Sequence, residues 1–121
     1  MDICNSNSIN FDHITELQDQ LGFDNMVNLF FKFNQELDAL MVQISIIEPG
    51  SVDFEKLIGK VHQSAGSAAA LGIIGIHRQL NLVETLAKSG KWDALRSELE
   101  RLTTTWQVIK ITLNNNGLLE N

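Results

Sequence analysis

The chain has 121 residues, a formal net charge of −6 and a single cysteine, Cys4. This length suits one domain with a core of its own, and a single cysteine cannot form an internal disulfide. The acidic balance argues against nucleic acid and anionic membrane surfaces as partners, because both select clustered Lys and Arg. Neither a signal peptide nor an apolar run of about 20 residues is recognised. We therefore expect a soluble, cytoplasmic, monomeric protein.

The N-terminal half is predicted to form one short helix and one long helix. Residues 1–10 are polar and are expected to be loose. Apolar residues spaced three or four apart predict a short helix over about residues 12–20, which Gly22 ends. A long amphipathic helix is expected over about residues 24–46, and Pro49-Gly50 end it firmly.

The C-terminal half is predicted to form three further helices. The first starts at a cap on Ser51 or Asp53 and leads to Leu71-Gly72, and the others span about residues 73–88 and 92–113. Residues 114–121 are expected to be a frayed tail. One proline and no period-two alternation leave little room for strands. The whole chain, 1–121, is thus predicted to be one all-α domain: an antiparallel four-helix bundle with a short N-terminal capping helix.

A run of small residues between Val61 and Gly72 carries one histidine, His62, with Gly66 four positions later. Positions four apart share one face of a helix, so Gly66 leaves the surface beside His62 without a side chain. A glycine within a helix costs about 1 kcal/mol relative to alanine, which indicates that something approaches closely. The pattern suits an exposed nucleophile that docks against another macromolecule.

Glu84 is the expected partner of this histidine. In an antiparallel hairpin the chain climbs about 9 residues from His62 to the turn and descends about 12 to Glu84. At ~1.5 Å per residue, these distances are roughly 13 and 18 Å, so the two side chains end near one level. A carboxylate there would accept a hydrogen bond from Nδ1–H and leave the Nε2 lone pair outward. The spacing alone leaves this pair a hypothesis.

The segment 61–84 resembles the signature of histidine-containing phosphotransfer (HPt) domains. That signature is a histidine followed by x-x-Lys-Gly-Ser-Ser, then Leu-Gly, with an acidic residue or glutamine twenty-two positions after the histidine (here 84 − 62 = 22). The matching positions are His62, Gly66, Ser67, Leu71, Gly72 and Glu84. The likeness extends over about residues 10–113. Ala65 stands where these domains usually carry lysine, and Ala65→Lys is expected to restore that cation.

The resemblance implies a phosphorelay protein with no kinase activity of its own. His62 would accept a phosphoryl group from a receiver-domain aspartate and pass it to another, Glu84 would orient the imidazole, and Gly66 would provide steric access. The implied partners are response-regulator receiver domains and a hybrid sensor histidine kinase. No cofactor is expected, because the partner receiver domain supplies Mg²⁺. The alternative is a helical adaptor that binds a receiver or kinase domain as an inhibitor without transfer, which Ala65 favours.

The remaining histidines and the absent motifs argue against other classes of site. His77, on the face of Glu84, is expected to be a surface residue, and His13, in the short first helix, is expected to have no functional role. No histidine has glutamate three positions before it, as di-iron bundles require. The sequence also contains no Cys/His zinc cluster and no phosphate-binding loop. We therefore expect no metal site and no nucleotide site.

Overall fold

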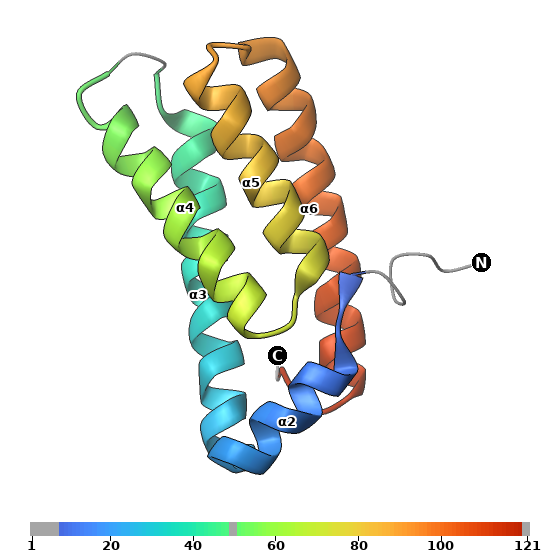
Figure 1. Cartoon of the computed structure of the whole chain (residues 1–121). Helices are drawn as coiled ribbons and strands as arrows, with labels where there is room; N and C mark the ends of the chain where they lie inside the picture. The colour runs from blue at the N-terminus through green and yellow to red at the C-terminus, as the bar shows by residue number, and fades with distance from the viewer. Residues whose placement is uncertain (1–7, 49–50, 120–121) are drawn as a thin grey trace.

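The computed structural model of the chain describes residues 8–48 and 51–119, and these residues form helices and no strands. The helices are α2 (Phe11–Leu21), α3 (Phe23–Ile46), α4 (Phe54–Ala70), α5 (Ile74–Lys88) and α6 (Trp92–Asn115). The four long helices lie lengthwise beside one another, and α2 lies below the turn between α4 and α5 (Figure 1). The predicted all-α class is confirmed for the described residues, whereas the antiparallel four-helix arrangement stays a prediction.

Two glycines set the turns that position the helices. Gly22 separates α2 from α3 with φ 83°, and Gly72 lies between α4 and α5 with φ 79°. Side chains rarely adopt this left-handed backbone, so glycine is the residue that turns the chain here at little cost. At Gly72 a Cβ would also lie 3.1 Å from the backbone oxygen of Asn10. The turn that joins α4 to α5 therefore needs glycine for its conformation and for its packing.

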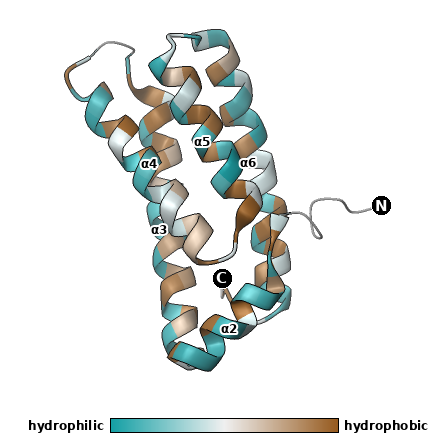
Figure 2. Ribbon diagram, in the orientation of Figure 1, coloured by the Kyte–Doolittle hydropathy of each residue, from teal (hydrophilic) through white to brown (hydrophobic). Residues whose placement is uncertain are grey.

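The core lies between the long helices, whose hydrophobic and hydrophilic residues alternate along each ribbon (Figure 2). Its largest fully buried side chains are Trp106, Phe30, Met26, Leu37, Ile73, Ile76, Leu80, Leu102, Ile109, Leu113 and Val83. Trp106 of α6 packs edge-on against Phe33 of α3, with ring centroids 5.6 Å apart. Its Nε1 donates a hydrogen bond of 3.0 Å to Asp38 Oδ1, so the polar edge of the ring is satisfied. Trp106 thereby joins α3 to α6.

The N-terminal expectation of a loose segment over residues 1–10 is wrong for Ser8, Ile9 and Asn10. Ile9 is buried, and the backbone N–H of Asn10 donates to Gly72 O at 2.8 Å. Ser8 packs so closely on α5 that a Cβ at Gly75 would lie 2.7 Å from its Oγ. These three residues cover the tip of the α4–α5 hairpin. Residues 1–7, which include Cys4, lie outside the described part of the chain, as do Pro49 and Gly50.

The expectation of a frayed tail over residues 114–121 is likewise wrong for 114–119. Helix α6 continues to Asn115, and Gly117 then reverses the chain with φ 76°. Leu118 and Leu119 return to the core and are both buried, and the N–H of Leu118 donates to Leu113 O at 2.9 Å. Burial of the two leucines holds this end in place. Residues 120 and 121 lie outside the described part.

Candidate functional site

His62 lies on the outer surface of α4, and its side chain is 73% exposed. A Cβ at Gly66, one turn farther along, would have no neighbouring atom within 4 Å, and the same holds for Gly59. Ala69 continues this exposed strip of small residues. The imidazole therefore projects from a surface of low relief, as expected from the small-residue run. Such a surface permits close approach of another macromolecule.

The structure brings His62 and Glu84 together across α4 and α5. His62 Nδ1 lies 3.0 Å from Glu84 Oε1. An ionised carboxylate only accepts hydrogen bonds, so Nδ1 is the protonated ring nitrogen of this pair. In the neutral imidazole, Nε2 then carries the lone pair. The geometry thus supplies an oriented, solvent-exposed nitrogen nucleophile.

A tight turn places the two side chains at one level. The N–H of Ile73 donates to Ala68 O at 2.8 Å, and the N–H of Gly72 donates to Ala69 O at 3.1 Å, so α4 ends and α5 begins within a few residues. The compact turn leaves the helices in close lateral contact. Because both helices rise by ~1.5 Å per residue, the register set at the turn persists to His62 and Glu84.

Lys88 completes a row of three polar side chains. Its Nζ lies 2.8 Å from Glu84 Oε2, one turn along α5, and the Glu84 side chain is only 14% exposed. The hydrogen bond from Lys88, followed by that from His62, holds the pKa of Glu84 below its ordinary value of 4.5, although partial burial opposes this shift. Glu84 is therefore a carboxylate at neutral pH. The i, i+4 spacing of Glu and Lys is the sequence signal for this contact.

Ala65 occupies the position at which HPt domains usually carry lysine, and its surroundings differ from those of His62. Ala65 is 2% exposed and belongs to the hydrophobic core. It lies three residues after His62, on the side of α4 that packs inward. A side chain at this position starts in the core, so a lysine here would have to extend outward past its neighbours to bring its ammonium near the imidazole.

The expectation of a surface residue is wrong for His77, which is partly buried, whereas the expectation that His13 has no functional role stays a prediction. The Nδ1 of the partly buried His77 donates to Ala65 O at 2.8 Å, and its Nε2 lies 3.2 Å from Asn81 Nδ2. His13 Nε2 donates to Ala70 O at 2.7 Å. The last carbonyls of a helix lack partners within that helix, so His13 satisfies one of them and ties α2 to α4. Both rings join helices, whereas His62 faces solvent.

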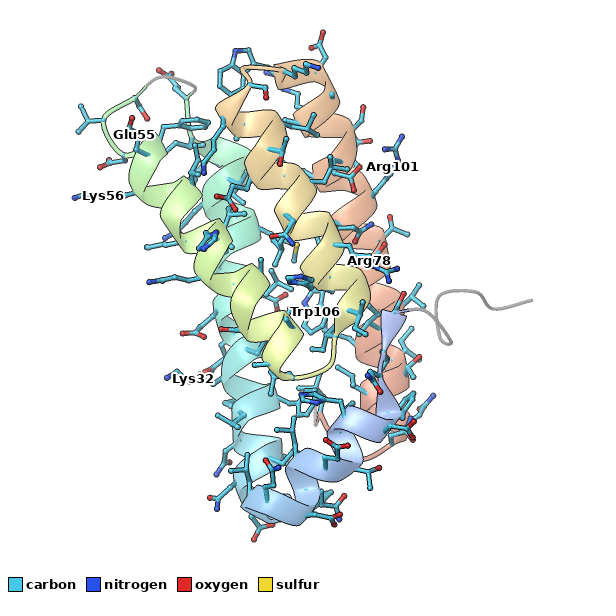
Figure 3. The ribbon with its side chains drawn as sticks, viewed as in Figure 1. Lys32, Glu55, Lys56, Arg78, Arg101 and Trp106 are labelled. Atoms are coloured by element: carbon cyan, nitrogen blue, oxygen red, sulfur yellow. The ribbon has the colours of Figure 1, made fainter. Side chains whose placement is uncertain are left out.

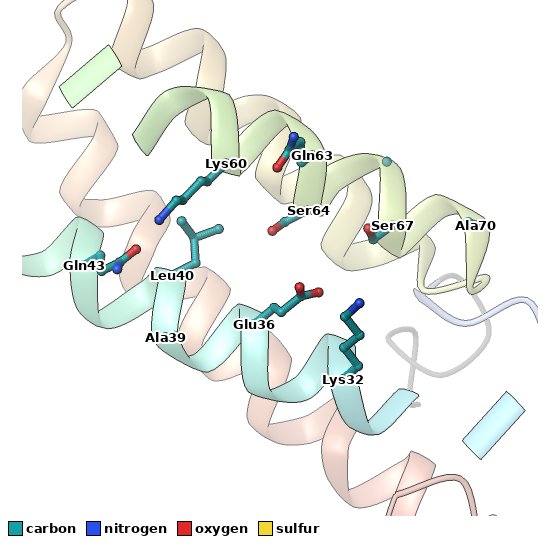
Figure 4. Close-up of a pocket in the computed structure, with 11 residues that line it drawn as sticks. Lys32, Glu36, Ala39, Leu40, Gln43, Lys60, Gln63, Ser64, Ser67 and Ala70 are labelled. Carbon is teal, nitrogen blue, oxygen red and sulfur yellow. The ribbon is translucent and has the colours of Figure 1, made fainter. Parts of the chain in front are cut away.

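A polar groove of about 760 Å³ lies between α3 and α4, next to the surface that carries His62. Its lining residues are Lys32, Glu36, Ala39, Leu40, Gln43, Lys60, Gln63, Ser64, Gly66, Ser67 and Ala70. In Figure 4, Glu36 and Lys32 of α3 point toward Ser64 and Ser67 of α4, while Lys60 of α4 points toward Leu40 and Gln43 of α3. Gly66 belongs both to this groove and to the strip beside His62. Sequence reasoning missed the groove, because its residues come from two separate helices.

Metal-binding clusters and membrane-spanning helices are both absent from the described residues. In residues 8–48 and 51–119, no three His, Cys, Asp or Glu side chains lie together in a way that could hold a metal ion. Arg78 and Arg101 lie on α5 and α6 in Figure 3, apart from the groove. No helix in the described ranges has both the length and the apolar character needed to cross a membrane.

Comparisons with protein-family models, with curated proteins and with solved structures found no match to this chain. The residues of the chain and their geometry are therefore the basis for a functional proposal.

Proposed function

We propose that the chain is a histidine phosphotransfer protein of a multistep phosphorelay, with His62 as the phosphoryl carrier. The observation that carries this proposal is the 3.0 Å contact between His62 Nδ1 and Glu84 Oε1 on an exposed helix surface. The contact supplies a fixed tautomer, a free Nε2 and a nearby negative charge. Gly66 supplies the open surface that a macromolecular donor requires. The HPt signature contains these three residues at the same spacing.

The reaction follows from the chemistry of the imidazole. The lone pair on His62 Nε2 attacks the phosphorus of an aspartyl phosphate on a receiver domain. An Nε2–P bond forms, the P–O bond to the aspartate breaks, and the aspartate leaves as a carboxylate. The ring becomes positively charged while Nδ1 keeps its proton, and Glu84 Oε1 stabilises that charge. The reverse sequence returns the phosphoryl group to another receiver aspartate.

The partner supplies what this chain lacks. Phosphoryl transfer requires in-line positioning and neutralisation of charge on the transferred group. The receiver domain of a phosphorelay ordinarily supplies Mg²⁺ and a lysine for this purpose. A hybrid sensor histidine kinase would be the original source of the phosphoryl group. The contribution of this chain is a nucleophile on a rigid helix, where placement is more accurate than on a loop.

The proposed architecture is an antiparallel four-helix bundle of α3–α6, with α2 capping one end. Two helices run antiparallel when increasing residue numbers in one contact decreasing residue numbers in the other. On α3 and α6, Asp38 contacts Trp106 and Met41 contacts Thr103. On α4 and α5, residue 62 pairs with 84 and residue 65 with 77. This arrangement keeps His62 on a helix supported along its length.

A helical adaptor without transfer is the second candidate, and the observation that favours it is Ala65. The usual lysine is missing, and the position is buried. In this function the same surface would bind a receiver or kinase domain and block it. The retained pair of His62 and Glu84 favours transfer, because an inhibitor does not require an oriented imidazole.

The test uses receiver domains phosphorylated with acetyl phosphate as donors. The parent chain should acquire one acid-labile, base-stable phosphate, and His62→Gln should abolish it while the helical circular-dichroism signal persists. His77→Gln is the matched control and should keep the label. Labelling that survives in His62→Gln would contradict the proposal. Receiver binding without any labelling of the parent chain would favour the adaptor.

A further inference from the structure

We propose that Lys88 is a positioning residue, which holds the Glu84 carboxylate so that it orients His62 without favouring protonation of Nε2. This inference rests on the proposed function, since it concerns the nucleophile of that reaction. Neither the small-residue run nor the HPt signature includes Lys88. The evidence for its role is the arrangement of three side chains on α4 and α5.

Each oxygen of the Glu84 carboxylate has its own partner. Oε1 lies 3.0 Å from His62 Nδ1, and Oε2 lies 2.8 Å from Lys88 Nζ. The carboxylate is largely enclosed at 14% exposure, whereas the side chains of His62 and Lys88 are mostly exposed. With Oε2 bound to Lys88, the carboxylate is held at both oxygens. Lys88 thereby restricts the rotation of the group that fixes the imidazole.

The charge of Lys88 matters as much as its geometry. A carboxylate beside an imidazole favours the imidazolium form, because opposite charges within a few ångströms stabilise each other. Imidazolium has a proton on Nε2 and no lone pair there, so it cannot attack phosphorus. An ammonium bound to the same carboxylate offsets the negative charge. Glu84 can then orient the neutral ring with a smaller tendency to draw a second proton onto it.

Position on the helix favours this role for Lys88. It follows Glu84 by four residues, the order in which a Glu–Lys pair is most favourable along a helix. It also lies in the last turn of α5, where the helix dipole attracts cations. The same pair is the first cause of the lowered pKa of Glu84. These effects keep the ammonium near Glu84 although its side chain is 62% exposed.

The charged or titratable groups on the helices next to His62 lie on α3, α4 and α5. They are Glu84, Lys88 and His77 on α5, Lys60 on α4, and Lys32 and Glu36 on α3 across the groove. His77 is engaged by Ala65 O and Asn81. Lys88 shares a carboxylate with the imidazole, so a change at Lys88 should affect His62 more than an equal change of charge elsewhere.

The first experiment follows the ¹⁵N-labelled imidazole of His62 by NMR as a function of pH, with no phosphoryl donor present. In Lys88→Met the ring should remain protonated to a higher pH than in the parent chain. Lys88→Arg should behave like the parent. Lys56→Met is the matched control, because it removes one exposed positive charge from α4 outside the proposed site, and it should leave the titration unchanged. An unchanged titration in Lys88→Met would overturn the proposal.

The second experiment measures transfer from a phosphorylated receiver domain across the same pH range. Lys88→Met should be about two- to fourfold slower near pH 6, the range that a partly exposed charge pair permits. It should match the parent above pH 8, where a histidine side chain is neutral. A loss of the same size at every pH would indicate a contact with the partner and would also overturn the proposal.

A double-mutant cycle then shows whether Lys88 acts through Glu84. In a Glu84→Gln background, Lys88→Met should have no further effect on the His62 titration or on the transfer rate. An effect that persists in this background would mean that Lys88 acts directly on the phosphoryl group, contrary to the proposal. If the parent chain accepts no phosphate, the proposed function fails, while the NMR titration still decides the role of Lys88.

Discussion

His62 and Ala65 lie three residues apart on α4, yet the His62 side chain is 73% exposed and Ala65 is 2% exposed. Three residues rotate a helix by about 300°, which leaves the two side chains about 60° apart around the axis, on either side of the boundary between solvent and core. One reaches solvent and the other enters the core. The position where HPt domains usually carry lysine therefore serves packing in this chain. The expectation that a lysine at Ala65 would restore a cation stays a prediction, and the buried position adds a cost in packing to it.

Ala65→Lys should lower the free energy of unfolding by roughly 1–3 kcal/mol, the usual range for a substitution that disturbs a core. The cause is the burial of a long charged chain where a methyl group packs. Urea denaturation measures this effect. Ala69→Lys is the control, because Ala69 is exposed on the surface of α4 that carries His62, and it should change stability little. An Ala65→Lys variant as stable as the parent would contradict this reading.

Gly66→Leu should leave the fold intact and strongly reduce transfer to His62. No atom lies within 4 Å of a Cβ at this position, so the leucine meets open space within the chain, and a better helix former replaces glycine. The added side chain occupies the surface that the partner is expected to contact. Stopped-flow transfer from a phosphorylated receiver measures the rate.

Gly59→Leu is the matched variant for this test. Gly59 also has open space around a Cβ, but it lies on the other side of His62, away from α2. If the partner docks over Gly66 and Ala69, Gly59→Leu should reduce the rate less than Gly66→Leu. Equal rates in Gly66→Leu and the parent would show that the partner docks elsewhere.

Glu84→Ala should slow transfer by roughly ten- to a hundredfold without abolishing it. Positioned acid–base groups typically contribute ~10²–10⁴. The effect of Glu84 should reach at most the lower end of that range, because Glu84 orients His62 and does not have to take its proton. Single-turnover kinetics with a phosphorylated receiver give the rate constant. Glu84→Gln, which keeps an acceptor for Nδ1–H, should retain more activity than Glu84→Ala. An unchanged rate in both variants would make Glu84 an ordinary surface carboxylate.

The stability of the fold should depend on the ionisation of Glu84 at acid pH. Lys88, and next His62, lower its pKa from 4.5 in the folded state. The corresponding stabilisation is present above pH 4.5 and is lost as the pH falls through the lower folded value. The difference in unfolding free energy between the parent and Glu84→Gln should therefore shrink as the pH falls below 4.5 and through the lower pKa of the folded state. Denaturation series at several pH values measure it, and a difference that grows on acidification would contradict the linkage.

The burial of residues near both ends of the chain could not be predicted from the sequence. Ile9, Leu118 and Leu119 are buried, although they lie in polar segments without a helical repeat. Periodicity detects a face only when several apolar residues recur at helical spacing. Single apolar residues that fold back after a turn provide no such signal. Leu118 and Leu119 follow Gly117, whose left-handed conformation reverses the chain, and the segment of Ile9 is held where the N–H of Asn10 donates to Gly72 O.

Patterns in the sequence alone predict the helical class, the approximate helix spans and the two residues of the candidate pair. Helical spacing defines which residues share a face, and a constant rise per residue places His62 and Glu84 at one level on either side of a short turn. These are local properties, so they can be derived without coordinates. The same reasoning made His62 the candidate nucleophile, because Gly66 leaves its surroundings bare.

The packing of the helices against one another sets which groups face each other across them. It made His77 and His13 ties to the carbonyls of Ala65 and Ala70, and it placed Ala65 in the core. It also gave each oxygen of Glu84 a separate partner. Such outcomes depend on the rotation of each helix about its axis and on the fit of its neighbours. Packing of the whole chain sets these quantities, and no segment of the sequence specifies them alone.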